Sequence, residues 1–120
     1  MKAQYQIEEM AGYLAARFIG TGTLEEVGQE FEPIAEHCKR TNNNNLLIDF
    51  RRVYANISLV DRYFLGERTQ IFAHYGLKVA FVGRPEQHDP RRFGEIVSQN
   101  RWVNLHVFTD VQSAEEWLLK

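Results

Sequence analysis

The sequence has few of the residues that build covalent or metal-based sites. Its single cysteine, Cys38, cannot form a disulfide within the chain, and we expect it to be a small buried side chain. No pair of cysteine or histidine residues has the spacing of a metal site. The four histidines fall in separate predicted elements: His37, His74, His88 and His106. We therefore expect neither a metal nor any other cofactor.

Long apolar runs are also missing. No segment approaches the ~18 consecutive apolar residues of a membrane span. Met1 and Lys2 are followed by polar residues rather than by the apolar core of a signal peptide. Together with a single cysteine, which agrees with a reducing compartment, this predicts a cytoplasmic protein without an integral membrane segment.

Signatures of nucleotide and nucleic-acid binding are absent as well. No glycine fingerprint follows a predicted strand and there is no P-loop. The net charge is -2, whereas a general nucleic-acid binder normally carries a strong basic excess. Ser58, His88 and Asp89 could be arranged as a catalytic triad, but such common residues meet in most α/β domains and serve better as a helix cap and solvated side chains. The sequence predicts a protein that is not an enzyme.

What the sequence does contain is organised around the stretch from Leu46 to Tyr75. A short apolar run, residues 46–50, is followed by Arg51 and Arg52 and then by a helical pattern that opens at Ser58, which is typical of a buried strand followed by a crossover helix. Further strands are expected at 4–8, 13–19, 77–82 and 103–108. Further helices are expected at 24–38, 89–100 and 110–118, the first of them kinked or divided between Gly28 and Pro33.

This order predicts the fold class. The first two strands are close enough to form an antiparallel hairpin, whereas strands separated by helices run parallel. We expect residues 1–120 to form a single layered α/β domain: an N-terminal β-hairpin, then βαβαβα units, with a five-stranded, mostly parallel sheet and helices packed over it.

Three segments together support a family resemblance. They are residues 47–51 (LIDFR), residues 78–83 (KVAFVG), and the stretch from Phe93 to Leu118 that contains VFTD and AEEWL. In order and spacing they resemble the stand-alone bacterial SpoIIAA-like proteins, also described as STAS or Sec14-like domains, over about residues 45–119. The resemblance implies a SpoIIAA-like fold in which one edge strand of the sheet is antiparallel.

The resemblance also draws attention to Ser58. Related anti-sigma-factor antagonists are switched by phosphorylation of a serine at the start of the helix after the third strand, within an Asp-Ser-Ser/Gly turn. Ser58 falls at that helix start, but Ile57 precedes it and Leu59 and Val60 follow it. Two roles are therefore open for Ser58, a phosphorylation switch and an ordinary N-cap.

The helix from Ser58 to Tyr75 has an unusually wide apolar stripe. Leu59, Tyr63 and Phe72 widen it beyond what packing on one sheet face requires. These side chains are either additional core or a surface that binds a protein partner or a second copy of the chain.

Arginines gather where the strands are predicted to end. Residues 41–101 contain nine Lys and Arg residues, eight of them arginines, against six acidic ones. Because ligands of open α/β sheets bind outside the carboxyl ends of the strands, these residues suggest an anion-binding site. Its predicted members are Arg51, Arg52, Arg84, His88, Arg91 and Arg92.

Two functions follow from these observations. The first is a non-enzymatic regulatory or protein-interaction module, which resembles the SpoIIAA-like proteins in its expected role. The alternative is a domain that binds a small anion or an apolar ligand at the carboxyl ends of the strands, although 120 residues leave no spare helix to cover an apolar cavity.

Overall fold

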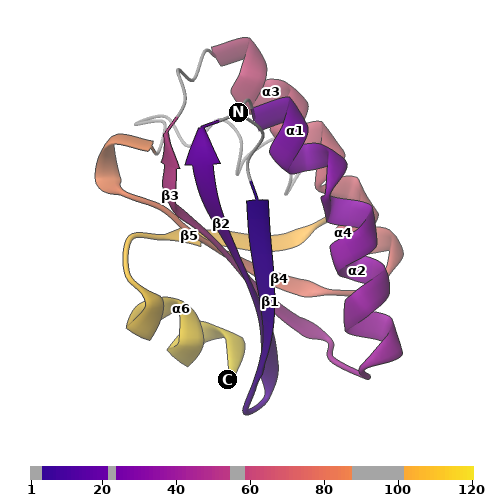
Figure 1. Ribbon diagram of the computed structural model, residues 1–120. Coiled ribbons are helices and arrows are strands. Elements are labelled where there is room, and N and C mark those ends of the chain that lie inside the picture. Colours follow the sequence, from indigo (N-terminus) through magenta and orange to yellow (C-terminus); the bar gives the residue numbers. More distant parts are fainter. Residues whose placement is uncertain (1–3, 22–23, 55–58, 88–101) are drawn as a thin grey trace.

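The computed structural model describes residues 4–21, 24–54, 59–87 and 102–120. Its centre is a five-stranded sheet whose strand order follows the sequence, β1-β2-β3-β4-β5 (Figure 1). β1 runs antiparallel to β2, and all the other neighbours are parallel. The strands are β1 (Gln4–Met10), β2 (Tyr13–Thr21), β3 (Asn45–Tyr54), β4 (Lys78–Val82) and β5 (Asn104–Phe108). The predicted α/β sheet with an antiparallel edge strand is confirmed.

Helices cover the two sides of the sheet unequally. Among the described helices, α1 to α4 pack on one side of the sheet, which we call the four-helix side, and α6 packs on the other, which we call the α6 side (Figure 1). The four-helix side carries α1 (Leu24–Gln29), α2 (Phe31–Arg40), α3 (Leu59–Arg68) and α4 (Gln70–His74). On the α6 side, α6 (Val111–Leu118) packs mainly on β4, β3 and β5. The start of β2 is covered as well, since Tyr13 and Ala15 are buried there, whereas Ile19 near the end of β2 is exposed on the open part of this face.

The alternation of side chains along the central strand divides the core in two. Ile48 and Phe50 of β3 point to the four-helix side, where they join Phe31 of α2 and Phe72 of α4. Leu47 points to the α6 side. There it packs with Tyr13, Ala15, Ala80, Val82, Ala114 and Leu118. Each large apolar side chain buried in this way stabilises the fold by about 1.5–3 kcal/mol, so a strand that is apolar on both faces belongs in the centre of the sheet.

The first predicted helix is divided, as expected from Pro33. α1 ends at Gln29, Glu30 lies between the two helices, and α2 begins at Phe31. Proline lacks a backbone N–H and its ring clashes with the carbonyl four residues earlier, here Gln29. Placing Pro33 in the first turn of a new helix avoids both costs, because amides of the first turn have no partner within the helix.

The expected continuous helix from Ser58 to Tyr75 is wrong in one respect, because it is broken at Thr69. α3 ends at Arg68 and α4 begins at Gln70. The hydroxyl of Thr69, a buried residue, donates to the carbonyl oxygen of Gly66, and this competes with the regular helical bonds at a position where glycine already weakens the helix.

Several predicted ends of elements are confirmed. Asn42, in the asparagine tract, has φ 60°, and Gly76, after α4, has φ 67°. Asp110 is the N-cap of α6 and accepts a hydrogen bond from the backbone N–H of Ser113 at 2.7 Å. Cys38 is completely buried among apolar side chains of the four-helix side. The helix predicted at 89–100 lies outside the described residues.

Membrane insertion has no support in the described helices. None of them is long and apolar enough to cross a bilayer.

Candidate functional site

A β-bulge near the end of β3 shapes the most distinctive surface of the molecule. Arg17 of β2 lies opposite Asp49, but Ile19, two residues later, lies opposite Arg52, three residues later. Phe18 alone therefore faces two residues of β3, Phe50 and Arg51, and the extra residue shifts the side-chain alternation by one position.

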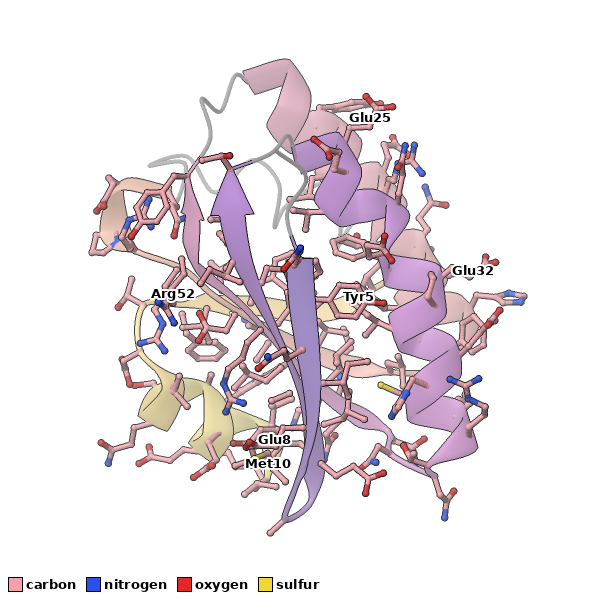
Figure 2. All side chains as sticks on the ribbon, in the orientation of Figure 1. Tyr5, Glu8, Met10, Glu25, Glu32 and Arg52 are labelled. Atoms are coloured by element: carbon pink, nitrogen blue, oxygen red, sulfur yellow. The ribbon has the colours of Figure 1, made fainter. Side chains whose placement is uncertain are left out.

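The bulge changes the face of the sheet to which Arg52 points, compared with the alternation of a regular strand. Val53 returns to the core of the four-helix side. Its neighbours Arg52 and Tyr54 consequently point to the α6 side. Figure 2 shows Arg52 on that side of the sheet, toward α6. The open end of β3 thus carries a cation and an aromatic ring on the same face.

Arg51 is held by the carboxylate two residues before it. Its Nε and Nη2 atoms donate to the two carboxylate oxygens of Asp49, at 3.0 and 2.7 Å, and its backbone N–H donates to the same group at 3.0 Å. Asp49 is a buried residue, so this pair neutralises a charge that would otherwise be costly to bury. Hydrogen bonding to Asp49 raises the pKa of Arg51. The guanidinium of Arg51 is therefore occupied within the protein.

Arg84 is fixed by three contacts just after β4. Its guanidinium lies over the ring of Tyr54, 4.5 Å from the ring centroid. Its Nε donates to Glu86 at 2.7 Å, and its Nη1 donates to the backbone oxygen of Arg51. Arg84 thereby connects the loop after β4 to the end of β3.

Gln87 completes the hydrogen bonding of the bulged strand. β4 pairs with β3 only as far as Asp49, so later carbonyls of β3 need other partners. The Nε2 atom of Gln87, a buried residue, donates to the carbonyl oxygens of Phe50 and Val53 at 2.9 and 3.0 Å. Its Oε1 atom accepts from the backbone N–H of Arg84 at 2.6 Å. One side chain thus joins the bulge to the loop that carries Arg84.

Four side chains form an exposed group at this end of the sheet, which we call the Tyr54 patch: Ile19, Arg52, Tyr54 and Arg84. Ile19 and Arg52 are paired across β2 and β3, and Tyr54 lies two residues beyond Arg52 on the same face. Tyr54 is 60% exposed and Ile19 42% exposed. Reasoning from the sequence missed both of them. The alternation along each strand could have identified Ile19, but Tyr54 depends on the bulge.

The predicted anion site is only partly assembled. Arg51, Arg52 and Arg84 do lie at the carboxyl ends of β3 and β4, as expected. Arg51 and Arg84 are engaged with Asp49 and Glu86, however, so donors of both guanidinium groups are already used within the protein. The remaining predicted members, His88, Arg91 and Arg92, lie outside the described residues. The described geometry favours a surface with paired charges over a pocket for a small anion.

The predicted helix surface also needs a correction. Phe72 is 0% exposed and packs against Phe31, with ring centroids 4.8 Å apart, so it is a core side chain and not part of an interface. Tyr63 of α3 is 38% exposed. The side chain of Leu59, like Ser58, lies outside the described residues.

Metal ligands do not gather in the described ranges. Across residues 4–21, 24–54, 59–87 and 102–120 there is no group of three or more His, Cys, Asp or Glu side chains that could hold a metal ion.

Comparison with known proteins gives a consistent result for the fold alone. No protein-family model matches the sequence, and no curated protein matches it significantly. Solved structures do match. An anti-sigma factor antagonist from Mycobacterium paratuberculosis superposes with a TM-score of 0.62 at 13% identity, covering 98% of this chain and 95% of the other.

Two further structures agree with the first. A protein from Shewanella loihica described as having a SpoIIAA-like fold gives a TM-score of 0.57 at 20% identity, covering 97% of this chain and 93% of the other. The Bacillus cell fate determinant SpoIIAA, in its phosphorylated form, gives 0.55 at 14% identity, covering 95% and 99%. The architecture described above is thus a SpoIIAA-like fold over nearly the whole chain.

Proposed function

We propose, from this SpoIIAA-like fold, that the protein is a regulatory protein-interaction module with no enzymatic activity of its own, acting in the cytoplasm. The observation that carries the proposal is the completeness of the match. The anti-sigma factor antagonist and SpoIIAA are covered over 95% and 99% of their own lengths. The chain therefore matches the fold of two regulators over nearly their whole length.

The exposed side of α3 is the contact surface that we propose first. Tyr63 is half-exposed there, and tyrosine is enriched at protein interfaces because it combines apolar area with a polar end. Leu59 and Ser58 precede it in sequence and belong to the same proposal. A second copy of the chain is the alternative occupant of this surface.

The test is capture of binding partners from the source organism by wild-type protein and by Tyr63→Glu, with light scattering of both. We expect a specific partner, or a dimer mass, with the wild type and a clear loss with Tyr63→Glu. Because Tyr63 lies at the surface, this variant should keep its stability to within about 0.5 kcal/mol.

Phe72→Ala serves as the matched core variant. It should lose about 3–5 kcal/mol of unfolding free energy, because it removes a fully buried ring, and should affect binding only through folding. If wild-type protein is monomeric and retains no specific partner, the interaction module is the wrong proposal.

The same capture experiment separates the two roles of Ser58. Ser58→Asp keeps a capping oxygen and adds a negative charge, whereas Ser58→Ala removes both. If both variants capture as much partner as the wild type, Ser58 is a helix cap only; if Ser58→Asp alone releases the partner, phosphorylation is a switch.

The alternative function, binding of a small anion or an apolar ligand, has less support. Arg51 and Arg84 are already engaged with carboxylates, and Arg52 stands on an open sheet face. Neither arrangement encloses a ligand.

A further inference from the structure

The Tyr54 patch differs from the rest of the open sheet face in its chemistry. Toward β1 that face is polar, with Glu8 paired to Arg17 at 3.4 Å. At the other end of β2 and β3, Ile19 and Tyr54 both expose large apolar areas, in diagonal positions, because Ile19 pairs with Arg52 and Tyr54 lies two residues beyond Arg52. Single exposed apolar side chains are ordinary, but an apolar pair bordered by arginines resembles the composition of protein interfaces.

The ring of Tyr54 is already held in place before anything binds. Arg84 lies against one face of the ring, and Arg84 is itself fixed by Glu86 and by the backbone of β3. Ordering a side chain on binding costs free energy, so a tyrosine that is already ordered loses less conformational entropy when a partner binds. Tyrosine and arginine are also the residue types that most often dominate binding energy in interfaces.

Arg52 differs from the arginines around it in having no carboxylate in direct contact among the described residues, whereas Arg51 interacts with Asp49 and also with the charge of Asp110. Arg17, Arg51 and Arg84 each have a carboxylate partner, in Glu8, Asp49 and Glu86. Arg52 is exposed and forms no ion pair with a residue in the described part of the chain. A surface with one uncompensated guanidinium beside two apolar side chains complements a partner that brings an apolar side chain and a nearby carboxylate.

We propose that the Tyr54 patch binds an acidic segment of a protein partner, which places an apolar side chain on Ile19 and Tyr54 and a carboxylate on Arg52. This inference rests on the proposed function and names the class of partner. It uses the α6 side of the sheet, whereas Tyr63 lies on the opposite, four-helix side.

The geometry favours this occupant over two others. A nucleic acid strand needs several uncompensated cations along its backbone, and here three of four arginines are neutralised. A free phosphate or carboxylate needs donors that converge from several directions, and Arg52 alone supplies one guanidinium on an open face.

The experiment is amide NMR of the isotope-labelled full chain during titration with defined probes. The first probe is a short peptide of Asp, Glu, Leu and Phe, and the second replaces its acidic residues with Lys. The third is a single-stranded oligonucleotide. We expect the acidic peptide at about 1 mM to shift the amides of Ile19, Arg52, Tyr54 and Arg84 and to leave those of α2 unchanged.

Substitutions in the Tyr54 patch show which side chains contribute to peptide affinity. Arg52→Glu should weaken the acidic peptide at least about tenfold, because it replaces an attraction by a repulsion. Tyr54→Ser should weaken it at least about fivefold. The matched control is Arg40→Glu, which changes the charge of an exposed arginine on α2 and should bind the peptide as the wild type does.

Each other outcome contradicts the proposal. Equal amide shifts with the lysine peptide would show that the negative charge of the peptide is not recognised. Amide shifts outside the Tyr54 patch, or no shifts at all, would show that the patch is not the binding site. Binding of the oligonucleotide alone would assign the patch to another class of ligand. If a partner is captured from cells and Arg52→Glu and Tyr54→Ser both retain it fully, this inference fails while the interaction module stands; if nothing is captured at all, the module fails first.

Discussion

At the scale of single residues, Gln87 supplies hydrogen bonds to the backbone at the end of β3, as β4 does to the backbone at its beginning. Two carbonyl oxygens that β4 does not reach accept from its amide group, and a backbone N–H of the adjoining loop donates to it. Buried backbone groups without a partner are costly, so a polar side chain in this place is a structural requirement rather than a sign of chemistry.

Replacement of Gln87 by leucine should therefore be strongly destabilising. Gln87→Leu has a similar size but leaves the carbonyls of Phe50 and Val53 and the N–H of Arg84 without partners, and we expect a loss of about 3 kcal/mol in urea unfolding. Gln70→Leu is the matched control, because Gln70 is exposed; it should change stability by less than about 0.5 kcal/mol. Equal losses in the two variants would show that the hydrogen bonds of Gln87 contribute nothing.

The placement of single side chains was also what the sequence alone predicted least well. Alternation and helical periodicity report which face a side chain takes only while an element stays regular. Phe72 was assigned to an interface although it packs in the core against Phe31, and Tyr54 was missed because a bulge shifts β3 by one residue. Both placements depend on contacts between segments that are distant in sequence, which no local pattern records.

At the scale of elements, close packing depends on two glycines that differ in what surrounds them. A Cβ atom on Gly83 would lie 2.8 Å from the ring of Phe50, which is itself buried under the four-helix side. A Cβ atom on Gly28 of α1 would lie 2.9 Å from Cδ of Arg68, the flexible side chain at the end of α3. The first neighbour cannot move easily, and the second can.

The two glycines should therefore respond differently to alanine. Gly83→Ala should lose about 2 kcal/mol, because the core must shift to accommodate a methyl group. Gly28→Ala should be neutral or gain up to about 1 kcal/mol, because alanine is the better helix former and Arg68 can move aside. Thermal unfolding of the two variants checks the prediction, and a larger loss in Gly28→Ala would contradict it.

Element types and their order were predictable for physical reasons. β3 is apolar on both faces and could only be a buried strand, and Pro33 forced a division of the first helix. The break at Thr69 was not predictable in the same way. It rests on a hydroxyl that bonds to the carbonyl of Gly66 in a buried site, and threonine in an exposed helix would usually be tolerated.

At the scale of the whole molecule, buried ionisable groups tie stability to pH. Burial raises the pKa of Cys38 to about 11, and burial together with a hydrogen bond to Glu115 raises the pKa of Tyr13 to about 12. Both groups are neutral in the fold and lose their protons more readily when the chain unfolds. Their contribution to stability is therefore fully present below the pKa of the unfolded chain and declines as the pH rises toward the pKa of the fold.

We accordingly expect stability to fall on the alkaline side, beginning near pH 9, the ordinary pKa of cysteine in an unfolded chain. Urea unfolding between about pH 7 and pH 11 measures this fall. Cys38→Ala should be less stable at neutral pH, because it leaves a small cavity. Its unfolding free energy should also fall less steeply as the pH rises, because the variant lacks the one proton that Cys38 releases on unfolding. Identical slopes in the variant and the wild type would mean that Cys38 titrates normally in the fold.

The strand order of the sheet has a consequence for how the protein is made. Because the described strands lie side by side in the order in which the ribosome releases them, each new strand pairs with the one synthesised just before it. No described strand has to enter between two that are already paired. The β1–β2 hairpin can form first as a template, and the sheet can then grow at one edge while the chain is still being synthesised. Among the described helices, α6 follows the last described strand in sequence and covers the other side of the sheet.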